Sequence, residues 1–412
     1  MNNKLKLLQN TIFLYILTFS SQFFNLLIIP YQARILGPEI FGKVGFILSI
    51  MLYVQLILDF GFLLSGTEAI TKNLNNNIKI RSIFTNIFVI KIILSIFLYF
   101  LLFILKFRIK VLSEEYIFFT LYYISFVINS FLPDFIYRGL EEMKILTLRT
   151  IFIKIVITIF VFIFLREKDD YLVLPIFNIF GNILALLIML YHLKRNFNIY
   201  FDINKINIKV IIKYSERTIP FFLSRIASTF YTAMNTFILG IYYPNTNVLG
   251  YYTSADKLVV ASKSFVSPVA DSFYPYMLKH KDFKLVKKIL MITIPIILIG
   301  GMILYYFSND IVTLIFGIEY QEVGSLLRYL LPIIIVIFPS YLIAFPVMAP
   351  LGLSKYTNYS NLLGAALHML MFSYILVTGE LNAKNVCVIS SITEVFIFLY
   401  RMLVIFLYKI KN

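Results

Sequence analysis

The chain contains the run IFTNIFVIKIILSIFLYFLLFIL at residues 83–105, in which Lys91 is the one charged residue. This run is longer than the about 20 apolar residues that a helix needs to cross a hydrocarbon core of ~30 Å. The same pattern recurs along the chain, because 60% of all residues are hydrophobic, 14% are charged and the mean hydropathy is +0.86. Ordinary soluble domains carry about 25% charged residues. The sequence therefore predicts an all-α polytopic membrane protein.

About 12 apolar runs are long enough to be transmembrane helices. The predicted spans are approximately 11–33, 40–64, 83–105, 115–137, 147–165, 171–193, 218–241, 248–277, 286–307, 326–349, 357–378 and 386–408. The eighth span carries several charges. We include it because the alternation of basic and less basic loops requires a crossing there.

Basic residues gather on alternate connections between the predicted spans. Clusters follow the second, fourth, sixth and eighth spans, at Lys72, Lys79, Arg81; Arg138, Lys144, Arg149; Lys194, Arg195, Lys205, Lys209, Lys213, Arg217; and Lys279, Lys281, Lys284, Lys287, Lys288. Loops rich in Lys and Arg stay cytoplasmic. We therefore predict a bacterial inner-membrane protein with both termini in the cytoplasm. Its net charge of +16 is explained by loops that face anionic lipid, and no nucleic-acid partner is expected.

The two halves of the chain resemble each other. The longest connection, from about Leu193 to Thr218, is basic and partly amphipathic and is expected to lie along the inner membrane surface. It separates two predicted six-helix lobes, 1–205 and 206–412. One shift of the sequence superimposes Leu36-Gly37 on Leu239-Gly240. Either this match is a chance result of glycine at helix ends, or the lobes are parallel repeats.

Five basic residues fall inside the predicted spans: Lys91, Lys154, Arg225, Lys257 and Lys263. Charges in a bilayer usually face a cavity or a partner. Arg and Lys are also the natural partners of phosphate. We predict that Arg225, Lys257, Lys263 and Lys91 bind an anionic substrate. Lys154 lies near the end of its span and is expected to snorkel to the inner surface.

Polar side chains share a helical face on several of the same spans. The predicted polar lining of a water-filled cavity consists of Gln22, Asn25, Ser228, Thr229, Thr232, Asn235, Thr253, Asp256 and Ser267. A packed helix interface, in which Ser and Thr are frequent, is the alternative, above all for the first span.

Two acids inside spans are candidates for ion coupling. Glu394 lies well inside the twelfth span and Asp59 lies toward the inner end of the second. An intramembrane carboxylate can carry H⁺ or Na⁺, although Asp59 could equally cap a helix or pair with a lysine. The three histidines show no metal-ligand spacing, and a phosphate-binding G-x-x-x-x-G-K-[ST] loop is absent. We expect no enzyme activity, metal or cofactor.

Three separated motifs follow one another along the chain. They are Pro30–Gly42 with Asp59-Phe60-Gly61, Pro133–Lys144, and Asn235–Gly240 leading to Gly250–Lys257. In their order and spacing they resemble the motifs of the Wzx-type polysaccharide flippases. The resemblance implies a fold similar to multidrug and toxin extruders, with two lobes in a V around a central cavity. It also implies movement of an undecaprenyl-diphosphate-linked oligosaccharide from the cytoplasmic to the periplasmic leaflet, for assembly of O-antigen or a related surface polysaccharide. With that substrate, Arg225, Lys257, Lys263 and Lys91 are expected to hold the diphosphate. The resemblance further implies alternating access and coupling to an ion gradient. It also implies a polysaccharide polymerase and a chain-length regulator as partners.

Other functions fit parts of the sequence less well. A multidrug-extruder-like antiporter would be expected to have a less cationic cavity. Lipid II flippases typically have two further helices and basic residues in the first helix, where this chain has Gln22 and Asn25. A membrane-embedded polysaccharide polymerase would be expected to have a large periplasmic loop rich in Arg and His, and the sequence shows none.

Overall fold

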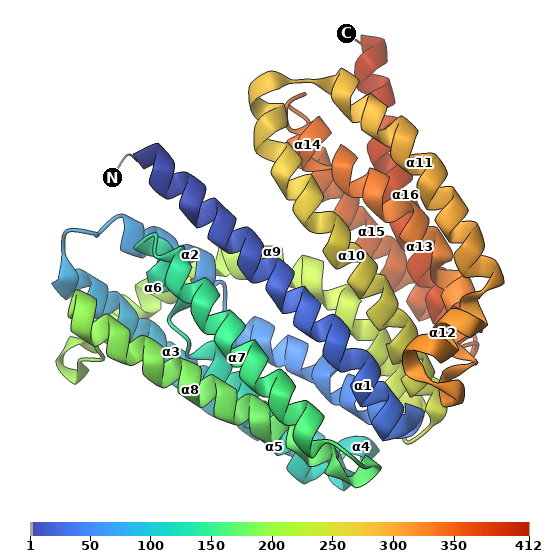
Figure 1. The fold of residues 1–412 in the computed structure, drawn as a ribbon. Coiled ribbons are helices and arrows are strands. Elements are labelled where there is room, and N and C mark those ends of the chain that lie inside the picture. Colours follow the sequence, from blue (N-terminus) through green and yellow to red (C-terminus); the bar gives the residue numbers. More distant parts are fainter. Residues whose placement is uncertain (1–2, 412) are drawn as a thin grey trace. The chain divides into compact units, whose positions relative to one another are not determined.

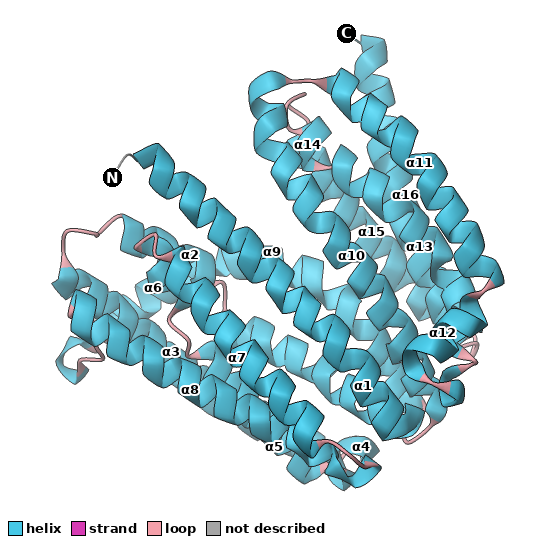
Figure 2. Cartoon of the chain, viewed as in Figure 1, coloured by secondary structure: helices cyan, strands magenta, loops and turns pink. Residues whose placement is uncertain are grey.

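The computed structural model describes the backbone of residues 3–411. It describes their side chains other than those of residues 3–8, 11, 213, 217, 220–221, 223–232, 275 and 409–411. Within residues 3–411 the chain is helical and forms no strand (Figure 2). The chain divides into two compact units, which are treated separately below. The predicted lobes, 1–205 and 206–412, stay a prediction.

Unit 1 comprises residues 1–28 and 46–233. Its helices, labelled in Figure 1, are the two ends of α1 (Asn3–Asp59), α2 (Phe62–Thr71), α3 (Asn77–Leu105), α4 (Lys110–Glu114), α5 (Tyr116–Ser130), α6 (Asp134–Gly139), α7 (Met143–Phe164), α8 (Val173–Phe197) and most of α9 (Ile208–Tyr242), with the short turns η1 (Lys168–Leu172) and η2 (Ile203–Lys205). Phe84, Ile136 and Tyr137 belong to its buried apolar core.

Unit 2 comprises residues 29–45 and 234–412. Its helices are the middle of α1, the end of α9, α10 (Asn247–His280), α11 (Phe283–Tyr306), α12 (Ser308–Phe316), α13 (Val323–Ile343), α14 (Phe345–Met348), α15 (Ser354–Val377) and α16 (Ala383–Lys411), with the turn η3 (Ile318–Tyr320). α13 packs against α10, α11 and α16, so it lies at the centre of this unit (Figure 1).

Nine helical stretches of the described residues are long and apolar enough to cross a membrane. They are Ile12–Thr71, Asn77–Leu105, Tyr116–Gly139, Met143–Phe164, Lys168–Phe197, Phe283–Tyr306, Val323–Met348, Ser354–Val377 and Ala383–Tyr408. The predicted all-α polytopic membrane fold is confirmed. The predicted number of about 12 spans is not established, because α9 and α10 are long helices but do not belong to the nine.

The first two predicted spans form one helix with a kink. α1 has 57 residues, about 85 Å at the usual rise per residue, and Gly37 interrupts it at φ 69°. Glycine adopts this conformation without the strain that a Cβ atom would cause. Pro38 follows and lacks the N–H group of a regular helix turn. The kink therefore falls between the predicted spans 11–33 and 40–64.

Several predicted spans are broken where the sequence was expected to continue. α1 ends at Asp59, and Phe60 and Gly61 both have positive φ before α2 begins. The fourth span is likewise divided at Pro133, between α5 and α6. Proline removes a backbone donor from a helix and also disfavours helical geometry in the residue before it. Apolar periodicity alone did not reveal these breaks.

The first motif has a structural role within unit 2. The Arg34 side chain donates from Nε to the Ile315 carbonyl at 2.9 Å and from its second terminal nitrogen to the Leu314 carbonyl. These carbonyls lie in the last turn of α12, where helices leave carbonyl groups without partners. Tyr320 donates its hydroxyl to the Ala33 carbonyl at 2.8 Å. Burial raises the pKa of Tyr320, which keeps this hydroxyl protonated and able to donate.

The connection between α8 and α9 is shorter than expected and is held on α3. The Asn86 side chain donates to the Lys205 carbonyl and accepts from the Asn207 N–H, both at 3.0 Å. Thr85 accepts from the Asp202 N–H at 3.1 Å. The amphipathic residues that were expected to form a surface linker instead begin α9 at Ile208.

Candidate functional site

Unit 2 contains an ion pair between two of the predicted site residues. The Lys263 ammonium on α10 lies 2.5 Å from the Glu394 carboxylate on α16, and the two side chains are 27% and 11% exposed. Lys263 is a predicted ligand of an anionic substrate, and Glu394 is a predicted residue for ion coupling. The structure brings the two residues together, so a change in the charge of one acts directly on the other.

A buried polar network lies beside this pair, and Asn235 is at its centre. Asn235 on α9 donates to the Ser390 hydroxyl on α16 at 3.0 Å. Its carbonyl oxygen is 2.9 Å from Nε2 of His368 on α15, whose Nδ1 is 3.0 Å from the Thr393 hydroxyl. Asn235 was a predicted lining residue. His368 was noted in the sequence but given no role, because its partners Asn235 and Thr393 lie on two other helices, α9 and α16.

The predicted residues of α10 have different environments. Thr253 is buried against Gly45, whereas Ser267 is half-buried and donates to Asp271 at 3.3 Å. Asp256 is half-buried and lies within electrostatic range of Lys257 and Lys263. The structure thus places Asp256 and both lysines in one region of α10.

Four predicted residues of α9 lie outside the side chains that the structure describes: Arg225, Ser228, Thr229 and Thr232. Their roles stay predictions, which rest on the helical spacing of the sequence.

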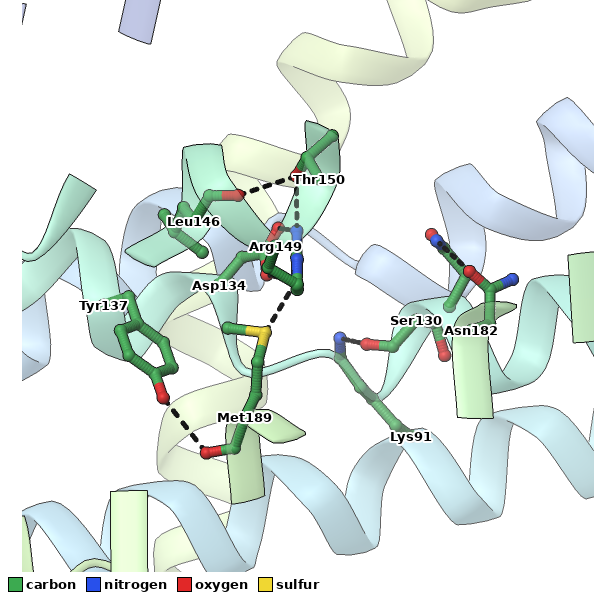
Figure 3. Close-up of polar contacts among 10 residues, drawn as sticks. Lys91, Ser130, Asp134, Tyr137, Leu146, Arg149, Thr150, Asn182 and Met189 are labelled. Carbon is green, nitrogen blue, oxygen red and sulfur yellow. Dashed lines mark hydrogen bonds and ion pairs between the residues drawn. The ribbon is translucent and has the colours of Figure 1, made fainter. Parts of the chain in front are cut away.

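Lys91 is buried in unit 1, where its ammonium donates to the Ser130 carbonyl (Figure 3). Ser130 is the last residue of α5, and the chain then passes through Pro133, which has no N–H group. Helix ends leave such carbonyls without an intrahelical donor, and a cation is favoured there. Lys91 therefore stabilises the break after α5, and its predicted contact with a diphosphate stays a prediction.

Asp59, the second candidate for ion coupling, accepts a hydrogen bond from Gln55 at 2.9 Å. It also lies within electrostatic range of Lys91. This arrangement agrees with the alternative that Asp59 pairs with a lysine. Gln22 is half-buried on α1, and its role as cavity lining stays a prediction.

Beside Lys91, α6 and α7 are joined by a second ion pair. Arg149 approaches both carboxylate oxygens of Asp134, at 2.7 and 3.4 Å, and also contacts the sulfur of Met189 (Figure 3). Its side chain is 8% exposed. From the sequence, Arg149 was assigned to a basic loop. No local pattern indicated that the carboxylate of Asp134, fifteen residues earlier, would face it.

A pocket opens next to Arg149, between α5, α7 and α8. Its volume is about 220 Å³, and its lining includes Lys154, Asn129, Asn178 and Asn182. The Lys154 ammonium lies 3.3 Å from the Asn25 side-chain oxygen. Lys154 therefore lies beside α1 within unit 1, in contrast to the expected snorkelling. Asn25, a predicted lining residue, is brought to the edge of a polar pocket.

Among the described residues, no group of three His, Cys, Asp or Glu side chains is arranged to hold a metal ion. The two candidate regions are therefore built from ion pairs, amides and hydroxyls. Such side chains can bind polar or charged groups.

The family model described as "Polysaccharide biosynthesis protein" matches residues 7–281, which is well over half of the chain. The chain belongs to this family. Two curated relatives in the comparison are both named "Putative O-antigen transporter". The one from Shigella dysenteriae is 26% identical over 88% of this chain and 91% of the relative, and the one from Escherichia coli K12 is 27% identical over 88% of both. Both names describe transporters and not enzymes.

Solved structures show the same fold at low sequence identity. An inward-facing MATE-family multidrug resistance transporter of the MOP superfamily has a TM-score of 0.74 at 15% identity, with 94% of both chains covered. The lipid II flippase MurJ in an inward closed conformation has a TM-score of 0.72 at 12% identity, with 96% of this chain and 87% of that chain covered. Identities this low establish the fold alone. This member of the polysaccharide biosynthesis family is therefore a multi-pass membrane protein with that fold.

Proposed function

We propose that the chain is a flippase that moves an undecaprenyl-diphosphate-linked oligosaccharide repeat unit from the cytoplasmic to the periplasmic leaflet of the bacterial inner membrane. The observation that carries this proposal is the family match over residues 7–281, together with two O-antigen transporter relatives that align with 88% of the chain. The transported unit would serve assembly of O-antigen or a related surface polysaccharide. A polymerase and a chain-length regulator would act on the product.

In this proposal the diphosphate is held by Arg225, Lys257, Lys263 and Lys91, and H⁺ or Na⁺ is carried by Glu394 or Asp59. The contact between Lys263 and Glu394 at 2.5 Å supports a link between diphosphate binding and ion binding. An entering diphosphate competes with Glu394 for Lys263, because both are oxygen anions that an ammonium group binds. Glu394 then loses its counter-charge, which favours uptake of a cation or proton.

The fold is also that of multidrug extruders, so an exported small molecule is the competing substrate class. Deleting the gene distinguishes the two. For a flippase, surface polysaccharide is lost and lipid-linked repeat units accumulate on the cytoplasmic side of the membrane. For a drug antiporter, surface polysaccharide is unchanged and sensitivity to exported compounds rises.

Returning Arg225 variants to the deletion strain tests the diphosphate site. Arg225→Ala is expected to reduce surface polysaccharide by at least about tenfold at a normal protein level, because one charge-assisted contact is worth roughly 1.5–3 kcal/mol. Arg225→Lys should restore part of the activity, since an ammonium group lacks the two-pronged geometry of the guanidinium. Wild-type polysaccharide in the Arg225→Ala strain would show that the diphosphate binds elsewhere.

The proposed orientation predicts the result of reporter fusions. Fusions after Lys79, Lys144, Lys213 and Lys284 and at the C-terminus should report the cytoplasm, because basic loops are retained there. Fusions near Lys110, Lys168 and Asn245 should report the periplasm. A periplasmic signal at Lys284 would mean that α10 does not cross the membrane.

A further inference from the structure

The pocket between α5, α7 and α8 lies entirely within unit 1 and has no role in the function proposed above. Its volume is about 220 Å³, below the roughly 300–1,000 Å³ that is typical of pockets for drug-sized ligands. It therefore has room for one small polar group and not for a whole oligosaccharide.

The walls of this pocket carry polar groups that both donate and accept hydrogen bonds. The lining includes the amides of Asn129, Asn178 and Asn182 and the hydroxyls of Ser125 and Thr150. An amide offers two N–H donors and one carbonyl acceptor, and a hydroxyl offers both roles. The Phe126 ring is also part of the lining and provides an apolar surface. Adjacent hydroxyl groups on a sugar ring match such a set, because each hydroxyl can donate and accept while the C–H face meets the aromatic ring.

Part of this hydrogen-bonding capacity is already used within unit 1, and part remains. Asn182 donates to the Ser125 carbonyl at 3.0 Å and so fixes α8 against α5. Asn178 donates to the Leu174 carbonyl of its own helix at 2.7 Å. Among the described residues, no contact occupies the Asn178 carbonyl oxygen or the two remaining N–H donors of Lys154, which bonds Asn25. These groups line the pocket and can bind a ligand.

The charges around the pocket argue against a diphosphate as its occupant. Arg149 is the strongest potential anion ligand in the lining, but Asp134 occupies its guanidinium at 2.7 and 3.4 Å (Figure 3). The Asp134 carboxylate would also repel a second anion at this position. Only Lys154 contributes a positive charge without a carboxylate partner among the described lining residues. One cation surrounded by amides suits a neutral ring or one with a single acidic substituent.

We propose that this pocket binds one sugar ring of the transported oligosaccharide and that Asn178 and Lys154 contribute to the choice of sugar. The inference rests on the proposed flippase function, because it assigns a subsite to the glycan of the same substrate. The diphosphate and the glycan then bind to different residues. A different repeat unit would then require different side chains at positions 178 and 154. The proposed diphosphate ligands Arg225, Lys257, Lys263 and Lys91 would be needed for every repeat unit.

Binding of free monosaccharides to the full-length protein in lipid nanodiscs tests the proposal. The probes are glucose, galactose, rhamnose, N-acetylglucosamine and glucuronic acid at millimolar concentration, observed by saturation-transfer NMR. Wild type is expected to bind at least one of them saturably. Asn178→Leu and Lys154→Met are each expected to weaken that binding about tenfold, the effect of losing roughly 1.4 kcal/mol. Asn178 bonds only a carbonyl of its own helix among the described residues, so its loss should not unfold the protein.

Asn204→Ala is the matched control, because Asn204 is exposed on η2 and does not line the pocket. It should bind sugar as wild type does. The proposal is overturned if wild type binds none of the five sugars, or if Asn178→Leu and Lys154→Met, folded with wild-type thermal stability, bind as tightly as wild type. The proposed function is tested separately by the deletion strain. Sugar binding without any dependence of surface polysaccharide on the gene would reject the flippase, and with it the transported glycan as the occupant of the pocket. Loss of surface polysaccharide in the deletion strain without any sugar binding by wild type would reject the pocket assignment alone.

Discussion

Replacing Gly250 by alanine is expected to leave almost no folded protein in the membrane. Gly250 lies at the start of α10, and a Cβ atom at this position would overlap the carbonyl group of Pro38 in α1. At Gly42 a Cβ atom would in turn lie 2.6 Å from the backbone nitrogen of Gly250. Helices in a membrane associate through close packing and not through the hydrophobic effect, so small residues at such crossings are essential. Overpacking against a rigid backbone costs about 1–3 kcal/mol or more.

The measurement is the yield and thermal stability of purified protein. Gly300→Ala is the matched control: it makes the same substitution inside helix α11, where no atom lies within 4 Å of the new Cβ. Alanine is favoured over glycine in a helix by about 0.5–1 kcal/mol, so this variant should be at least as stable as wild type. If Gly250→Ala were recovered with wild-type yield and stability, the close crossing of α1 and α10 would be disproved.

The sequence was sufficient to predict where most helices lie, because apolar length is a local property. The run at residues 83–105 became the main part of α3 (Asn77–Leu105), and a kink at Gly37 separates the first two predicted spans. The motif Gly250–Lys257 was recognised by resemblance, but its physical cause was not visible. Only glycine fits at position 250, because the Pro38 carbonyl group occupies the place of a Cβ atom. The two residues are far apart in the sequence.

The candidate site was less predictable, since its contacts join distant positions. Lys263 and Glu394 are 131 residues apart, and Asn235 and His368 are 133 apart. Helical spacing groups polar residues on one helix but cannot say which helix each face meets. Arg149 shows the same limit, because the pairing of its guanidinium with Asp134 depends on the break between α5 and α6.

Removing one partner of the Lys263–Glu394 pair is expected to cost more than removing both. Glu394→Gln leaves the Lys263 ammonium without its carboxylate, and Lys263→Met leaves the carboxylate without its cation. Loss of one member of a buried pair typically costs about 3–5 kcal/mol, whereas an apolar replacement of both is often neutral. Thermal unfolding of both single variants and of Lys263→Met combined with Glu394→Leu measures the difference. A double variant less stable than either single variant would show that the pair does not couple the two residues.

The Lys263–Glu394 pair is also expected to affect the rate of transport. Outward movement of the two phosphate charges is favoured by the membrane potential, at about 2.3 kcal/mol per charge for each 100 mV. Return of an empty cationic site to the cytoplasmic side is favoured by the same field, because that side is negative. The step that needs Glu394 is therefore release, in which an ionised Glu394 competes with the diphosphate for Lys263 and a glutamine amide competes only weakly. We therefore expect Glu394→Gln to slow flipping at least about tenfold, since at least ~1.4 kcal/mol of this competition is lost.

Asp59→Asn is the matched control, because it also replaces a carboxylate by an amide but lies at the end of α1 and should slow flipping less. The measurement is flux of lipid-linked oligosaccharide in vesicles with an imposed potential and no pH or Na⁺ gradient. If the potential alone drives the cycle and Glu394 displaces the diphosphate from Lys263, wild type moves substrate at its full rate under these conditions and Glu394→Gln does not. If a proton or Na⁺ gradient is required, wild type is slow until that gradient is restored. Equal and full flux from wild type and Glu394→Gln would remove Glu394 from the transport cycle and leave the potential as the only driving force.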